Sequence, residues 1–339
     1  MNNDESMSTL RAALYDYEPD AVQAALRASF DANAIVKLGF PFEEMIGADA
    51  LYDTAYQPLH TAIPDIERRD TIVVHGTDRD GNQWIGCCGY YTGSFLRPWL
   101  EIAPTGRQVS MRYHEFFRLI DGRVVEMQGL WDIPGLMLEA GCWPMSPSLG
   151  LEWQVPGPAT QDGVFRAPRD NELSSSNLLV VEEMLTNMGK HPAQPLEAMQ
   201  LEKYWHPKMN WYGPAGIGTA RGIEGFRSCH QIPFLRAMPD RRPADAPAHF
   251  FAENNYVAVT GWPNMEMTIT SDGWMGIAPS GQSIEVRSLD FWRLENGLIR
   301  ENWVLIDILS VYDQIGVDVF ARMKQLHPEP GTQYAGIAV

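Results

Sequence analysis

The sequence predicts an α+β fold that occurs twice in tandem. Residues 102–112 read IAPTGRQVSMR and residues 277–287 read IAPSGQSIEVR, so one motif returns after 175 positions. In each half of the chain a helical pattern comes first and a run of strand-like segments follows. Helices that precede a meander of antiparallel strands are typical of a curved sheet with helices over one face. We therefore expect one such unit in each half.

The repeat extends in both directions from this motif. At the same offset Gly86 meets Gly261, and Trp99 meets Trp274. No gap is needed between residues 47 and 141. Since the repeats of solenoid proteins are far shorter than this, the pattern indicates a duplicated domain.

A stretch rich in Pro, Gly and Ser separates the two copies. We expect a first domain over residues 1–143, an extended connector over 144–173, a second domain over 174–328 and a tail over 329–339. A chain of 339 residues is long for one core and comfortable for two.

Helical signals open each copy. In the first, Pro19 occupies a first-turn position ahead of DAVQAALRASF. In the second, three serines at 174–176 precede NLLVVEEMLTNM, and PLEAMQLEKYW predicts another helix. The strand-like segments that follow are TIVVHGT, QWIGCCGYYTG, QVSMRYHEFFRL and RVVEMQGLWDI in copy one, and AHFFAE, YVAVTGWP, SIEVRSLDFWRL and LIRENWVLIDI in copy two.

The last two strands of each copy form a predicted hairpin. Asp-Gly at 121–122 and Asn-Gly at 296–297 are signals for a two-residue turn. Such a turn fixes the register, so we expect Glu115 opposite Gln128 and Asp290 opposite Trp303. One face of each hairpin is then mainly apolar but carries carboxylates in matching columns. The other face carries His114 and several arginines, and we expect it to lie in solvent or in an interface.

The carboxylates on the apolar face are the candidates for chemistry. Asp132 and Asp307 occupy matching columns near the end of the last strand, and Glu115 and Asp290 lie roughly 13 Å away on the same face. Burial raises the pKa of a carboxyl group, and a carboxyl that titrates near neutrality suits proton transfer at carbon. The alternative is that these acids cap helices or pair with arginines.

Other motifs carry weaker signals. His206, Trp211 and Tyr212 fall in one segment of copy two and could line the mouth of a pocket. The run GPAGIGTARG at 213–222 lacks the spacing and the context of a dinucleotide-binding motif, so we expect a loop. No spacing of His, Asp or Glu resembles a metal site, and we expect neither a metal nor another cofactor.

Bulk properties narrow the classes of partner and compartment. The formal charge of −17 argues against nucleic acid and anionic membranes as partners. The first residues show no signal peptide, and no apolar run is long enough to span a membrane. The four cysteines include no CxxC motif, and the adjacent pair at 87 and 88 should point to opposite faces of a strand. This pattern favours reduced thiols in the cytoplasm.

Taken together, the motifs resemble the SnoaL-like polyketide cyclase family of the NTF2-like superfamily. In copy one they are Pro-Asp at 64–65, IAPTG at 102–106, FFRLIDGRVVE at 116–126, Asp132 and Gly141. In copy two they are Pro-Asp at 239–240, IAPSG, FWRLENGLIRE, Asp307 and Gly316. The resemblance covers nearly the whole of both copies. It implies two α+β cones, each a curved, mostly antiparallel sheet covered by N-terminal helices, that pack as an internal pseudo-dimer.

The resemblance also implies roles for the four acids. In the family, the Asp that matches Asp132 and Asp307 is the general acid/base of an intramolecular aldol ring closure that needs no cofactor. Related ketosteroid isomerases place a protonated acid, which donates to a developing enolate, where Asp290 and Glu115 stand. Family members have a Trp four residues before the catalytic Asp, which copy two keeps as Trp303 and copy one replaces with Gln128. Copy two is therefore predicted to be closer to a working site.

The resulting hypothesis is a cofactor-independent acid/base enzyme that acts on a small hydrophobic carbonyl compound by aldol cyclisation, isomerisation or a lyase step. The predicted binding residues are Trp303, Gln128, Tyr212, Trp211, His206 and Tyr113. The alternative is a non-catalytic ligand-binding or scaffold protein, whose acids would be satisfied by arginines or helix N-termini. Hydrolysis of an epoxide or ester would need an Arg–Asp pair on the inner face, and the sequence shows none there. Further homo-oligomerisation stays open.

Overall fold

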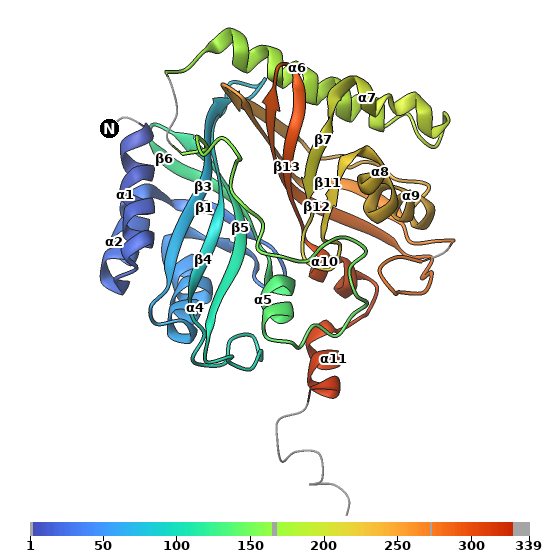
Figure 1. The fold of residues 1–339 in the computed structure, drawn as a ribbon. Coiled ribbons are helices and arrows are strands. Elements are labelled where there is room, and N and C mark those ends of the chain that lie inside the picture. The colour runs from blue at the N-terminus through green and yellow to red at the C-terminus, as the bar shows by residue number, and fades with distance from the viewer. Residues whose placement is uncertain (1–2, 165–167, 272, 328–339) are drawn as a thin grey trace, which may run out of the picture.

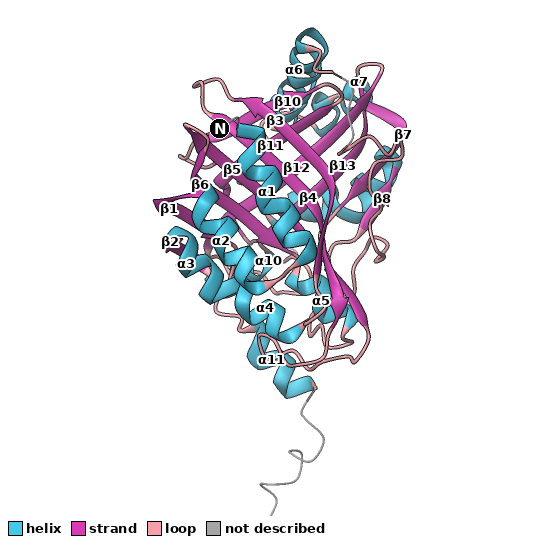
Figure 2. Ribbon diagram, turned by 90° about the vertical axis from the view of Figure 1, so that its left-hand side faces the viewer, coloured by secondary structure: helices cyan, strands magenta, loops and turns pink. Residues whose placement is uncertain are grey.

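The computed structural model describes residues 3–164, 168–271 and 273–327, and it consists of two α+β domains side by side (Figure 1). The predicted tail at 329–339 lies outside the described residues. Each domain has a curved sheet with helices over one face, and the sheets of the two domains face each other (Figures 1 and 2). Among the described residues, no helix is both long and apolar enough to cross a bilayer.

The first domain begins with two helices and continues into a six-stranded sheet of order β2-β1-β6-β5-β4-β3. Its strands pair antiparallel except for β1 and β6, which run parallel. The elements are α1 (Asn3–Asp16), α2 (Pro19–Ser29), β1 (Phe30–Leu38), β2 (Glu43–Ile46), α3 (Gly47–Leu51), the π-helix η1 (Tyr52–Tyr56), α4 (Gln57–Ala62), β3 (Glu67–Thr77), β4 (Gln83–Ser94), β5 (Gln108–Ile120), β6 (Arg123–Trp131) and α5 (Ile133–Glu139).

The second domain has the same order of strands except at the counterpart of β3. Here the strand is divided into a two-residue piece and a later strand. The elements are α6 (Asn171–Met188), the 3-10 helix η2 (Leu196–Met199), α7 (Leu201–Tyr204), β7 (Trp205–Tyr212), β8 (Thr219–Arg221), α8 (Gly222–Phe226), the π-helix η3 (Arg227–Gln231), α9 (Ile232–Ala237), β9 (Arg242–Pro243), β10 (Ala248–Glu253), β11 (Tyr256–Thr268), β12 (Ser283–Glu295), β13 (Leu298–Ile306), α10 (Ile308–Gln314) and α11 (Val319–Leu326).

The N-terminal helices form largely for the reasons that the sequence indicates. Pro19 is the first residue of α2, whose buried positions Val22, Leu26 and Ser29 recur at helical spacing. The helix α6 begins before the predicted serines because the Asp170 side chain caps it by accepting from the Leu173 N–H at 3.0 Å. The helix predicted for PLEAMQLEKYW is interrupted, since Gln200 has a left-handed φ of 50° between η2 and α7.

The two domains pack sheet against sheet about an internal pseudo-twofold axis. His114 of the first domain contacts the Leu289 carbonyl at 2.7 Å, and the rings of Phe116 and Phe291 lie 5.0 Å apart. Each of these pairs joins residues of the same column of the repeat, as expected where equivalent surfaces meet at a twofold axis. The expectation that the face of His114 lies in an interface is confirmed.

The predicted hairpin register is wrong by one residue in both domains. The structure pairs Glu115 with Gly129 and Asp290 with Val304. A β-bulge after the turn inserts one extra residue into the last strand, Val125 in β6 and its counterpart Arg300 in β13. A shift of one residue moves every later side chain of the strand to the other face.

The gapless match between the copies also fails over one strand pair. Gly86 pairs with Phe116, whereas its structural counterpart Ala258 pairs with Phe291, so Gly261 is not the equivalent of Gly86. The loop between β3 and β4 is longer than the turn between β10 and β11, so the equivalent residues of β4 and β11 are at first fewer than 175 positions apart. An irregularity in β11 between Gly261 and Met265 then brings the separation of equivalent residues back close to 175. The columns around Asp132 and Asp307 keep the offset of 175.

Candidate active site

Asp132 and Asp307 occupy equivalent places between the two domains. Asp307 precedes α10 and accepts from the Ser310 N–H at 3.2 Å, from the Phe40 N–H of the first domain at 3.1 Å and from Arg287 at 3.3 Å. Asp132 precedes α5 and has the equivalent partners, namely the N–H groups of Gly135 and Ala215, each at 3.3 Å, and Arg112 at 3.7 Å. Burial raises the pKa of both carboxyl groups, to about 6 for Asp307.

These contacts define a pair of clasps across the domain interface. Each aspartate caps its own helix and also accepts from a backbone N–H of the other domain. The structure therefore gives both side chains the helix-cap and arginine partners that the alternative interpretation requires. The space that both aspartates line measures 10 Å³ and is too small for a substrate, whereas Asp132 also lines a separate cavity of about 250 Å³.

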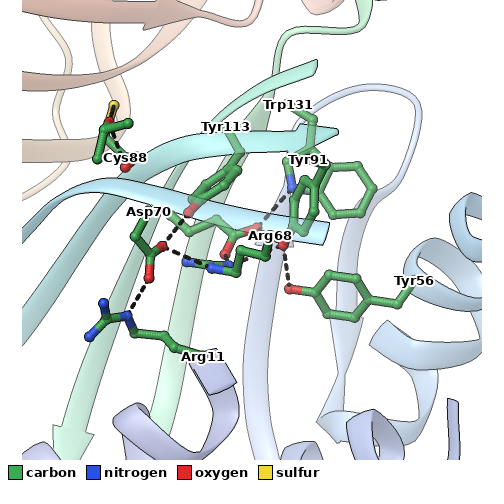
Figure 3. Close-up of polar contacts among 10 residues, drawn as sticks. Arg11, Tyr56, Arg68, Asp70, Cys88, Tyr91, Tyr113 and Trp131 are labelled. Atoms are coloured by element: carbon green, nitrogen blue, oxygen red, sulfur yellow. Dashed lines mark hydrogen bonds and ion pairs between the residues drawn. The ribbon is translucent and has the colours of Figure 1, made fainter. Parts of the chain in front are cut away.

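Glu115 belongs to a buried ion-pair network in the first domain, of which Figure 3 labels Arg68 and Asp70. It pairs with Arg68, and both side chains have no exposed surface. It also accepts from the Trp131 indole N–H at 2.9 Å and the Tyr91 hydroxyl at 3.0 Å. Arg68 continues to Asp70 at 3.0 Å. These groups pair with one another and fill the interior of the first cone, and among the described residues the buried Arg68 Nη2 is left without a hydrogen-bond partner.

This network corrects one expectation from the sequence. An Arg–Asp pair does lie on an inner face, because Arg68 and Asp70 belong to β3 and turn into the cone of the first domain. Arg11 of α1 and the Tyr113 hydroxyl also contact Asp70, and the positive charges hold the pKa of Asp70 below its ordinary value although burial opposes this. The pair is enclosed by its partners.

Asp290, the counterpart of Glu115, lies in different surroundings. It lines a cavity of about 330 Å³ inside the second cone and is the only carboxylate among the described residues of that wall. Its hydrogen bond from the Ser288 hydroxyl is 3.0 Å long. Burial raises the pKa of Asp290 to about 7, and the bond from Ser288 offsets this only in part.

Substitutions between the copies explain why one cone is full and the other hollow. Strand pairing makes Pro243 the counterpart of Arg68, Met265 that of Tyr91, Ser288 that of Tyr113 and Ile306 that of Trp131. The π-helices η1 and η3 likewise align Tyr56 with Gln231. Every replacement in the second domain is smaller, and the cation that neutralises Glu115 has no equivalent. Asp290 is therefore left beside open space.

Aromatic and polar side chains line the rest of this cavity. The aromatic residues are Trp205, Trp211, Phe226, Phe234, Phe250 and Trp292. Within the described part of the chain, five further wall residues carry a buried polar atom without a hydrogen-bond partner. These atoms are the indole N–H groups of Trp205 and Trp292, the His230 Nδ1, the Gln231 Oε1 and the Arg241 Nε. Because unpaired buried polar groups are costly, this wall is suited to a ligand that pairs with them.

The six predicted binding residues lie in different parts of the structure. Trp211 lines the cavity, where its ring stacks on His230 at 4.3 Å. Tyr212 and Trp303 lie in the hydrophobic cluster between the sheets, and Gln128 contacts Thr260 across the same interface. Tyr113 belongs to the network around Asp70, and His206 lies outside the cavity wall. The bulges account for Trp303 and Gln128, since they turn both side chains to the interface face.

His230, Arg241, Ser288 and Trp292 are cavity residues that sequence reasoning missed. The signal for Ser288 was available, because the column that holds Tyr113 in copy one holds a much smaller residue in copy two. In the described part of the chain no group of three His, Cys, Asp or Glu side chains is placed to hold a metal ion. Cys87 and Cys88 are free and point to opposite sides of β4, one into the core and one into the interface.

The fold and this cavity define an NTF2-like α+β cone with one acid in the wall of its cavity. The sequence profile of the SnoaL-like polyketide cyclase family matches residues 17–139 and 194–315. The chain therefore belongs to that family and carries two copies of its domain.

Solved structures of single-domain proteins resemble one domain of the chain. IdmH from Streptomyces antibioticus is 17% identical over 42% of this chain and 99% of its own, with a TM-score of 0.35. TsrD from Streptomyces laurentii is 18% identical over 41% and 93%, with a TM-score of 0.34. An NTF2-like protein from Burkholderia thailandensis is 17% identical over 42% and 98%, with a TM-score of 0.32. No curated protein matches the chain.

Proposed function

We propose that the second domain is a cofactor-independent acid/base enzyme and that Asp290 is its proton-transfer group. The substrate is a small hydrophobic carbonyl compound, and the reaction is an aldol cyclisation, an isomerisation or a lyase step. The observation that carries this proposal is the position of Asp290 in the apolar cavity, with a pKa raised to about 7 and no cation paired with it among the described residues. A carboxyl group that titrates near the working pH can remove a proton from carbon and return it.

Other groups of the wall complete the proposed mechanism. Trp292 lies two residues from Asp290 on β12, so both side chains point to the same face. Its buried indole N–H has no partner in the described part of the chain and is placed to donate to the oxygen of an enolate. Ser288 donates to Asp290 and orients its carboxyl group. The aromatic wall keeps bulk water from the carbanion.

In this proposal the first domain is a scaffold. Its acid is paired with Arg68 and enclosed, and Asp132 and Asp307 hold the domains together. This arrangement favours the non-catalytic alternative for the first copy alone. The catalytic role that family resemblance implies for Asp307 is then replaced by a role in assembly.

Deuterium exchange from solvent tests the proposal without knowledge of the natural substrate. We expect the protein to accelerate exchange at the carbon next to the carbonyl of 2-tetralone, followed by NMR. Asp290→Asn should lower the accelerated rate by about a hundredfold or more. Because the base must be ionised, the rate should rise with pH and reach half its plateau near pH 7.

Asp307→Asn is the matched control, since it makes the same chemical change at a carboxyl group outside the cavity wall. We expect this variant to exchange at the wild-type rate. Loss of exchange in Asp307→Asn together with full exchange in Asp290→Asn would return the catalytic role to Asp307 and refute the proposal.

A further inference from the structure

The wall of the second cavity carries an unpaired cation. Arg241 immediately precedes β9 and is partly buried. One of its terminal nitrogens donates to the Met188 carbonyl at 2.5 Å, but its Nε has no partner and no carboxylate forms an ion pair with it among the described residues. Its neighbour Arg242 is different, because Glu266 neutralises it. Burial without a counter-charge lowers the pKa of Arg241.

The groups around Arg241 leave its charge uncompensated. His230 lies in the same wall, and burial together with the charge of Arg241 lowers its pKa to about 3, so the imidazole is neutral. Its Nδ1 is buried without a partner in the described part of the chain. The guanidinium and the imidazole therefore offer hydrogen bonds to a ligand, and Arg241 adds a positive charge. Guanidinium groups bind carboxylates strongly, with charge-assisted bonds of defined geometry.

Arg241 and Asp290 lie toward different ends of the cavity. The strand β9 pairs with β11 at Met265, which in turn pairs with Val286. Val286 is four residues from Asp290 along β12, or about 13 Å at the rise of a β-strand. Aromatic side chains line the cavity, including the stacked pair Trp211 and His230. A ligand that reaches both groups is elongated and flat.

The opening of the cavity is on the side of Arg241. Arg242, Pro243 and Ala248 line the cavity and are also exposed, and they flank the break between β9 and β10. In the first domain the equivalent strand β3 is continuous. A ligand that enters here meets the cation first, while its apolar body passes on toward Asp290.

From this arrangement we propose that the cavity binds an aromatic carbonyl compound that also bears a carboxylate, with the carboxylate on Arg241 and the carbon to be deprotonated beside Asp290. The assignment rests on the proposed function of this cavity and names its substrate class. His230 donates a second hydrogen bond to the carboxylate, and its ring, stacked on Trp211, supports the flat body of the substrate.

Calorimetric titration of the full chain with 2-naphthoate and with its uncharged methyl ester tests this inference. We expect the wild type to bind the carboxylate roughly tenfold or more tightly than the ester. Arg241→Met should abolish that preference, and Arg241→Lys should keep part of it because it keeps the charge. Arg236→Met is the control, since Arg236 is exposed on α9 and lies outside the cavity wall.

Three results overturn the inference, namely equal affinity of the wild type for the two probes, binding of neither, or a preference that survives in Arg241→Met. The outcome is separable from that of the proposed function. If exchange on 2-tetralone requires Asp290 but the carboxylate preference does not require Arg241, only the substrate class is wrong. If the preference requires Arg241 but Asp290→Asn exchanges at the wild-type rate, the cavity binds such acids without the proposed chemistry.

Discussion

Replacement of Asp290 by Asn is expected to stabilise the protein at neutral and alkaline pH. Burial raises the pKa of this carboxyl group from 3.8 to about 7 in the folded state. The folded state therefore keeps the proton over a range in which the unfolded chain has lost it. Folding becomes less favourable as the pH rises from about 4 to about 7, and the cost is constant above that range. Asn cannot ionise, so the variant does not bear this cost.

The size of the effect follows from the separation of the two pKa values. At 1.36 kcal/mol for each pH unit, the full cost at pH 8 is about 4 kcal/mol. The cavity leaves Asp290 partly accessible, so we halve this to about 2 kcal/mol. For a domain of this size the stabilisation corresponds to a rise in melting temperature of roughly 4–8 °C. At pH 5 only about a third of the interval between the two pKa values has been crossed. The stabilisation by Asp290→Asn should therefore be about a third of its value at pH 8.

Glu115→Gln makes the same chemical change in the same column of the repeat, and we expect the opposite sign. Glu115 is fully buried against Arg68, and removal of one partner leaves a buried charge without its counter-ion. Such a change costs roughly 3–5 kcal/mol. Scanning calorimetry of the two variants at pH 5 and pH 8 measures both effects. If Asp290→Asn were as destabilising as Glu115→Gln, Asp290 would be a paired structural ion and the account of the hollow cone would be refuted.

Two further predictions concern the clasps and the shape of the cavity. Asp307→Ala leaves the N–H groups of Phe40 and Ser310 without an acceptor, so thermal unfolding should show a loss of about 1–3 kcal/mol; an unchanged melting temperature would contradict the role in assembly. Ser288→Tyr restores the residue that fills the first cone, and it should weaken 2-naphthoate binding about tenfold or more while the circular dichroism spectrum stays the same; undiminished affinity would mean that the probe binds elsewhere.

The duplication, the fold and the equivalence of Glu115 and Asp290 were all predicted from the sequence. Two separated copies of one motif with matching turn signals restrict the topology more strongly than either copy alone. The faces of the last strand were predicted wrongly because a two-residue turn sets the register only next to the turn. The bulges at Val125 and Arg300 lie three residues after the last turn residue, beyond two regular pairs. They occur in both copies, so comparison of the copies could not expose them.

The partners of the four acids were harder to predict because they come from distant segments. The N–H groups that meet Asp307 and Asp132 belong to the opposite domain, and no local pattern marks a backbone N–H as a partner across an interface. Arg68, which encloses Glu115, is one strand beyond the neighbouring strand of the sheet. The sequence repeat does align Arg68 with Pro243. The loss of the arginine is informative only when it is known that this face of β3 turns into the cone.

The internal duplication explains how one cone can carry an unfavourable cavity. An apolar cavity with a buried, unpaired carboxyl group lowers the stability of the domain that contains it. The first domain has the same fold with the cavity filled and its acid paired, and the clasps at Asp132 and Asp307 join the two units through backbone groups of both. A stabilised copy attached in this way supports a copy whose interior is arranged for chemistry. On this view the divergence at Arg68 and Tyr113 is a division of roles between two equivalent positions, one structural and one reactive.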